Sequence, residues 1–224
     1  MVFNLRFQKS RLLEQIVYEI SYHQPSVDAM VDELIKFYPT PVKFNQNNLQ
    51  GFLGEMYLRT SLKEIKEKRL QEDPSVDRRV VLDYIPQNNP NSKYLFTRTK
   101  NGTVVVSDDK EENKAEYDYI LKVDNTLVVC EIKLASDKSH IKPIFREWHI
   151  NKLFDPLIDI QNNKTKFGYL VVLPRNKIYS NSHLRSKIRF NGGIILSFPM
   201  PLQEWKEFVL EEILPAYRMK TIGF

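Results

Sequence analysis

The sequence predicts a mixed α/β fold, in which one sheet is covered by helices on both faces and a helical pair precedes it. Apolar residues recur at helical spacing in residues 9–23 and again in residues 46–70. Residues 116–134 alternate as two strands of a hairpin. The apolar run 167–173 and the shorter run 194–198 have the composition of strands buried on both faces. Strands that alternate with helices in this way favour a layered α/β architecture.

The N-terminal half begins with helices. After the helix in residues 9–23, Ser26 is placed to cap a second helix. We expect residues 1–45 to form a helical extension and residues 46–224 to form the main domain. The long helix of residues 46–70 contains Gly51 and Gly54, each of which costs up to about 1 kcal/mol relative to alanine. The glycines are expected where the sheet approaches the helix backbone closely.

The middle of the chain contains a predicted insertion at about residues 85–115. A strand is expected over residues 79–84 before it. Within the insertion, residues 94–99 and 103–107 are expected to pair across the Asn101-Gly102 turn.

The C-terminal half contains three predicted helices. The first covers residues 137–162, with Trp148 among its apolar markers, and Pro156 is expected to kink or split it. A basic helix is expected over residues 180–190. The last helix covers residues 202–213 and should end before Pro215.

Charged side chains gather in the hairpin of residues 116–134. With a two-residue turn at residues 124–125, Asp118 faces Glu131 and Glu116 faces Lys133. Like charges directly opposite each other destabilise a sheet by about 0.2–1 kcal/mol. A divalent cation between the carboxylates would remove this repulsion. The alternatives are a solvated polar face and a three-residue turn, which would move one carboxylate to the other face.

Glu55 is a third carboxylate of interest. It follows Gly54 and borders the apolar stripe of its helix, so it is expected to point at the edge of the core. The alternative is a surface ion pair with Arg59 at i,i+4.

Other residue types exclude several functions. Cys130 is the single cysteine and lies on the expected core face, so it is expected to be an unreactive core residue. The four histidines, His23, His140, His149 and His183, have no spacing typical of a zinc site. For His140 and His149 a surface or core position is favoured, and contact with DNA is the alternative. No glycine-rich phosphate loop or serine-hydrolase motif is present.

Basic residues concentrate in one segment. The net charge is +5, yet no acidic residue lies between Asp159 and Glu204. Such a segment favours a polyanionic partner, while the alternative is an ordinary solvated surface. The expected nucleic-acid contacts are Lys164, Lys166, Arg175, Lys177, Arg185, Lys187 and Arg189.

The sequence also predicts the compartment. No run of about 18 apolar residues is present, so no membrane span is expected. The first fifteen residues lack the apolar core of a signal peptide. A single cysteine fits a reducing compartment, and a cytoplasmic location is expected, in the host cell if the protein is viral.

The set Asp118–x12–Glu131–x–Lys133, behind a helix that carries Gly54-Glu55, resembles the motif of the PD-(D/E)XK nuclease superfamily. That superfamily has the restriction-endonuclease-like fold and includes Holliday junction resolvases and RecB-type nucleases. The resemblance covers roughly residues 46–200 and includes the element order. Tyr117 stands where the motif has proline. In size and composition the chain also resembles nuclease-fold proteins of archaeal viruses.

The resemblance implies a role for each motif residue. Asp118, Glu131 and the carbonyl of Ile132 would hold Mg²⁺ or Mn²⁺, and Glu55 would complete the site. Lys133 would orient or deprotonate the attacking water, with a pKa lowered by burial near a cation. Gln161 corresponds loosely to a glutamine of RecB-like members. The family implies a homodimeric, metal-dependent DNA endonuclease, acting on junctions or branched DNA.

Two alternatives remain open at this stage. One is a RecB-like exonuclease on the same core. The other is a DNA-binding protein without catalytic activity on a nuclease scaffold. Glu116 is similarly open between a further metal ligand and a partner that offsets Lys133, and the second is favoured.

Overall fold

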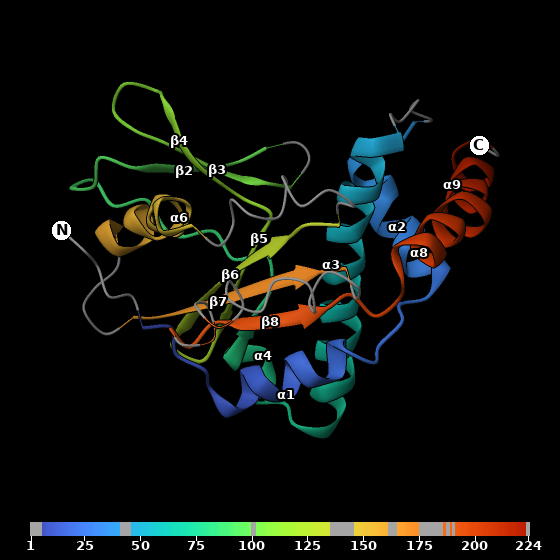
Figure 1. The fold of residues 1–224 in the computed structure, drawn as a ribbon, viewed down its shortest axis with the longest axis horizontal. Coiled ribbons are helices and arrows are strands. Elements are labelled where there is room, and N and C mark those ends of the chain that lie inside the picture. The colour runs from blue at the N-terminus through green and yellow to red at the C-terminus, as the bar shows by residue number, and fades with distance from the viewer. Residues whose placement is uncertain are drawn as a thin grey trace.

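The computed structural model of the 224-residue chain is described over residues 6–40, 46–99, 102–134, 146–160, 165–174, 186, 189 and 191–222 (Figure 1), with only the backbone considered for residues 46–50. Its helices are α1 (Arg11–Ile20), α2 (Val27–Phe37), α3 (Gln46–Glu72), α4 (Val76–Arg79), α6 (Glu147–Ile160), α8 (Leu202–Phe208), the π-helix η3 (Val209–Ile213) and α9 (Leu214–Ile222). Its strands are β1 (Val80–Val81), β2 (Leu95–Arg98), β3 (Val104–Ser107), β4 (Asn113–Tyr117), β5 (Tyr119–Val123), β6 (Thr126–Ile132), β7 (Lys166–Leu173) and β8 (Ile194–Ser197).

The described strands form two sheets. The larger is mixed, with five strands in the order β1-β5-β6-β7-β8, and the smaller has three strands in the order β2-β3-β4. In the larger sheet β1, β5 and β6 are antiparallel, whereas β6, β7 and β8 are parallel. The predicted mixed α/β class is therefore confirmed. The predicted pairing of residues 94–99 with 103–107 is confirmed as β2 and β3.

The edge of the larger sheet at β1 differs from the prediction. The strand expected over residues 79–84 is only the two-residue β1. Asp83 has a left-handed φ of 50°, which turns the chain away soon after β1.

Within the described ranges, every helix is too short or too polar to span a lipid bilayer.

The β5–β6 hairpin has the predicted turn and register. Tyr119 is paired with Cys130, and Val123 is paired with Thr126 at the turn end. Asp124, in the first position of the turn, has a φ of 53°, which Asp tolerates better than most residues. The two-residue turn at residues 124–125 is therefore confirmed.

The chain leaves the larger sheet at Asp118, and this corrects the predicted hairpin. Residues before Asp118 belong to β4, where Glu116 is paired with Val105 of the smaller sheet. Glu116 does not face Lys133, so the interpretation that it offsets Lys133 is wrong. The reason is a bend at Asp118, which ends the β5–β6 ladder at Tyr119.

The two faces of the larger sheet bury separate cores. Helices lie on both sides of this sheet (Figure 1). On one face, Leu121 and Cys130 pack in a cluster with residues of α1, α2, α3 and α8. On the opposite face, Ile120 and Val129 pack with α6 and with the inner side of the smaller sheet. Helices thus cover both faces, as predicted. The described part of the N-terminal segment contributes to both cores.

Gly54 lets α3 approach the end of β6. A Cβ at this position would lie 2.3 Å from Leu134 Cδ1 and 3.7 Å from Ile132 Cγ2. Among the described residues, a Cβ at Gly51 would meet nothing within 4 Å. The predicted close approach is confirmed for Gly54 and is wrong for Gly51.

This difference gives a stability prediction. Gly51→Ala should raise the free energy of unfolding by about 0.5–1 kcal/mol, because alanine loses less backbone entropy in a helix. Gly54→Ala should give none of this gain, since the new methyl group must displace Leu134. Urea denaturation of both variants beside the wild type measures the difference. A gain of equal size in both variants would contradict close packing at Gly54.

Contrary to the predictions, Pro156 does not split its helix and Pro215 does not end one. Helix α6 runs through Pro156, which is buried like its neighbours Phe154 and Leu157. Packing of that face offsets the hydrogen bond that proline cannot donate. Pro215 is the second residue of α9 and not a stop signal. It lies in the first turn after η3, where Leu214 N–H donates to the Val209 carbonyl in the wider π pattern.

Candidate catalytic and metal site

Three of the predicted site residues meet at the end of β6. Glu131 is buried within β6, with 2% of its surface exposed. The Nζ atom of Lys133 lies 3.4 Å from Glu131 Oε2 and 3.2 Å from Asp118 Oδ2. One ammonium group therefore contacts both carboxylates. We refer to Asp118, Glu131 and Lys133 as the carboxylate site.

Backbone hydrogen bonds fix the geometry of this site. Ile132 N–H donates to Asp118 Oδ2 at 2.8 Å. Lys133 N–H donates to the Val172 carbonyl of β7 at 3.1 Å. The side chain of Asp118 thus takes the place that a further residue of β5 would occupy beside β6. The bend that overturned the predicted pairing of Glu116 is also what brings Asp118 into the site.

Burial and repulsion act on Asp118. Burial raises the pKa of Asp118, the Glu131 carboxylate raises it further, and Lys133 partly offsets both, so that the pKa lies at about 6. The pKa of Lys133 is lowered by burial but raised more by Asp118 and Glu131, and the net shift is upward. The lowered pKa expected for Lys133 presupposed a neighbouring cation. In this structure its immediate neighbours are two anions.

Glu55 joins the site from the opposite side of the sheet. It lies on α3, is partly buried and directly follows Gly54, which contacts the end of β6. Burial raises the pKa of Glu55 to about 8, with a further contribution from Asp118, while Arg59 and Lys133 lower it. Asp118 is thus one of the charges that act on Glu55. The Glu55 carboxylate makes no hydrogen bond to another described side chain or backbone group.

Arg59 is a site residue that the sequence analysis missed. It is 4% exposed, so the predicted surface pair between Glu55 and Arg59 is wrong. Its guanidinium donates to Asp83 Oδ1 at 3.0 Å, to the Gly102 carbonyl at 3.0 Å and to the Asp118 carbonyl at 3.2 Å. Arg59 therefore fixes the backbone of Asp118 through a hydrogen bond to its carbonyl. The sequence did indicate that Arg59 is buried, because Arg59 lies three residues after Met56 and shares its apolar helix face.

Aromatic rings enclose the same guanidinium. Its Cζ atom lies 5.0 Å from the ring centroid of Tyr119 and 5.7 Å from that of Phe37. Such contacts favour arginine over lysine, because the planar guanidinium stacks on rings and donates several hydrogen bonds in one plane.

His149 is a second missed residue. Its Nε2 atom lies 3.6 Å from Glu131 Oε2, and its side chain is 19% exposed. That nitrogen is buried and has no hydrogen-bond partner within the described part of the chain. His149 is on α6, so nothing in its local spacing pointed to Glu131. Only the packing of α6 on the sheet brings the two together.

The remaining predicted residues lie at the surface or outside the described residues. Lys166 and Arg189 are described and exposed. Outside the described residues lie Lys164, Arg175, Lys177, Arg185, Lys187, Gln161, His140 and His183. Cys130 is fully buried, and burial raises the pKa of its thiol, as expected for an unreactive core cysteine.

The donor set fits a hard divalent cation in part. Among the residues that the structure describes, no three His, Cys, Asp or Glu side chains gather closely enough to hold an ion by themselves. Mg²⁺ is commonly bound by one or two carboxylates and keeps several waters. Asp118 and Glu131 meet this requirement, and the cationic Lys133 already occupies the space between their oxygens. The pair therefore favours positive charge at this point.

Comparison with family models, with curated proteins and with solved structures finds no match for this chain. The resemblance to the PD-(D/E)XK superfamily thus depends on the motif residues and on the order of elements. That order is α3, the β5–β6 hairpin, α6 and β7.

Proposed function

We propose that this protein is a metal-dependent deoxyribonuclease that hydrolyses phosphodiester bonds as an endonuclease. The observation that carries the proposal is the cluster of one buried carboxylate, Glu131, and one partly buried carboxylate, Asp118, around one lysine at the end of β6. A structural ion pair does not require a second carboxylate, and burying two acids beside each other is costly. Arrangements that lower the stability of the fold, such as two acidic side chains buried side by side, concentrate at functional sites.

Each residue has a role in the proposed reaction. Asp118 and Glu131 hold Mg²⁺ or Mn²⁺, with the Ile132 carbonyl and Glu55 as further ligands. When bound, the ion supplies Lewis-acid activation of the phosphate and of the attacking water. Lys133 orients that water and offsets negative charge on the phosphate oxygens. Exposed cations such as Lys166 and Arg189 contact the DNA backbone without sequence preference.

Branched or junction DNA is the substrate favoured by the family resemblance. A RecB-like exonuclease would use the same residues but would require a DNA end. The third candidate, a DNA-binding protein without catalysis, is favoured by one observation. Lys133 contacts both carboxylates and offsets one of their two negative charges without a metal ion.

A nicking assay tests the proposal. Supercoiled plasmid and a four-way junction are incubated with Mg²⁺, with Mn²⁺ or with a chelator. The wild type should cleave only with metal, and Glu131→Gln should lower the rate by roughly a hundredfold or more, since it removes a charge needed in the transition state. Glu211→Gln, at an exposed carboxylate of η3, is the matched control and should cleave like the wild type.

The outcomes separate the three candidates. Equal cleavage by the wild type and Glu131→Gln would contradict the proposal. Cleavage of linear but not of closed circular DNA would favour the exonuclease. Salt-sensitive DNA binding with no cleavage under any metal condition would favour the binding protein.

A further inference from the structure

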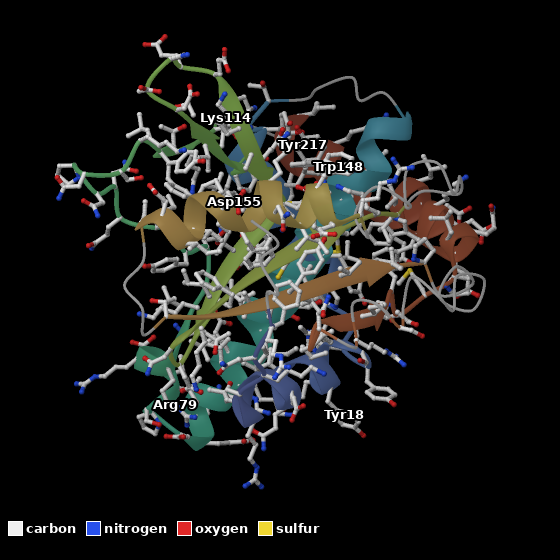
Figure 2. The ribbon with its side chains drawn as sticks, turned by 60° about the vertical axis from the view of Figure 1, so that its left-hand side comes forward. Tyr18, Arg79, Lys114, Trp148, Asp155 and Tyr217 are labelled. Carbon is white, nitrogen blue, oxygen red and sulfur yellow. The ribbon has the colours of Figure 1, made fainter. Side chains whose placement is uncertain are left out.

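An exposed tryptophan lies beside the carboxylate site. Trp148 was expected as an apolar marker of its helix and therefore in the core. Instead, 55% of its surface is exposed, while Leu153 and Leu157 of the same helix are buried. Tryptophan is enriched at binding interfaces, where its ring supplies a large apolar contact area. Figure 2 labels Trp148 near one end of α6 and Asp155 further along that helix.

Ring contacts connect this tryptophan to the site. The centroids of the Trp148 and His149 rings are 5.6 Å apart, with an interplanar angle of 89°. His149 Nε2 in turn lies 3.6 Å from Glu131 Oε2. The exposed indole is therefore separated from a predicted metal ligand by one imidazole ring.

Two exposed cations lie near Trp148, among acidic residues that include Asp155 two turns further along α6. Lys152 lies four residues after Trp148 on α6, on the same helix face, and is exposed. Arg146, just before the helix, is also exposed. Glu147 is the acidic residue of the first turn. A flat aromatic ring beside flexible cations is the combination that binds single-stranded nucleic acid, in which bases stack on the ring and phosphates meet the cations.

We propose that Trp148 stacks on an unpaired base next to the scissile phosphate, so that the substrate class is DNA with a single-stranded segment. This inference depends on the proposed function, because stacking would present a strand to the carboxylate site. In an intact duplex the base faces are already stacked on each other and are not available to an indole. Flaps, splayed arms and junction branch points expose such faces.

Binding can be measured without cleavage. The chain has two tryptophans, and Trp205 is fully buried among Tyr57, Phe198 and Phe208. Only Trp148 can therefore be quenched by a stacked base. In a Glu131→Gln background, a 15-nucleotide oligothymidylate should quench the tryptophan fluorescence, and a 15-base-pair duplex should not. Trp148→Phe should remove the quenching.

Affinity gives the second measurement. By fluorescence anisotropy with labelled oligothymidylate, Trp148→Ala should weaken binding by about five- to a hundredfold, and Trp148→Phe should weaken it less. Binding of the duplex should change less than about twofold. Because the side chain is largely exposed, neither variant should alter the thermal unfolding curve, which serves as the folding control.

Two results would overturn the inference. One is an unchanged oligothymidylate affinity in Trp148→Ala. If that variant also dissociates a dimer of the protein, Trp148 belongs to a protein interface and not to a DNA-binding surface. The other is an equal loss of single-strand and duplex binding. These binding results are independent of the nicking assay, so a failure of the proposed nuclease activity would be recognised separately.

Discussion

Arg59→Met is expected to lower the free energy of unfolding by roughly 3 kcal/mol. The substitution keeps most of the side-chain volume but removes a buried guanidinium with three hydrogen bonds. The carbonyl oxygens of Gly102 and Asp118 would lose their charged donor, and the ring contacts with Phe37 and Tyr119 would lose their cation. Urea denaturation measures the change. Metal-dependent cleavage should fall as well, since Arg59 holds the backbone of Asp118.

Arg98 provides a matched control for this prediction. It also contacts Asp83, at 3.6 Å from Oδ1, but its side chain is 32% exposed. Arg98→Met should therefore cost less than about 1 kcal/mol. Arg59→Lys should recover only part of the loss, because an ammonium group cannot donate in the fork geometry of guanidinium. Equal losses in Arg59→Met and Arg98→Met would contradict the structural role of Arg59.

Glu55→Gln is expected to stabilise the metal-free protein at pH 9, by about 2–4 kcal/mol. The pKa of Glu55 is raised from 4.5 to about 8 in the folded protein. Between these values the folded state binds a proton that the unfolded state has lost. The free energy of unfolding of the wild type should therefore fall as pH rises from about 4.5 to about 8. Glutamine cannot ionise, so its contribution stays constant with pH.

Denaturation midpoints at pH 5 and pH 9, in the presence of a chelator, measure this difference. Glu67→Gln is the control, because Glu67 lies on the same helix and is exposed. The control should keep the wild-type pH dependence, whereas Glu55→Gln should flatten it. If both variants follow the wild type, Glu55 is not buried beside Asp118. Glu55→Gln should also lose metal-dependent cleavage, because the variant lacks a proposed metal ligand.

The local parts of the fold could be predicted from the sequence. Alternating apolar residues and an Asp-Asn turn specify the β5–β6 register from Tyr119 to Thr126. The buried strand β7 followed in the same way from an apolar run. Such features depend on neighbours in sequence, which periodicity captures.

Other parts depend on contacts between distant segments. The change of sheet at Asp118 is invisible to alternation, since Tyr117 and Tyr119 have the spacing of one strand face. In the structure they lie in different cores. The approach of His149 to Glu131 requires α6 to cross the sheet, and the burial of Arg59 requires Asp83 and the β2–β3 hairpin to surround it. No local pattern encodes these arrangements.

The hydrogen bond from Ile132 to Asp118 has a further consequence for ligand binding. A buried backbone N–H without a partner costs about 1–3 kcal/mol, so Asp118 Oδ2 cannot move away freely. The carboxylate is held in place because it accepts the hydrogen bond that the last residue of β6 would otherwise donate to a neighbouring strand. A cation that binds at this point would contact a carboxylate oxygen, Asp118 Oδ2, whose orientation is already fixed in the folded protein. The entropy of ordering that ligand would then be part of the cost of folding, and not of binding.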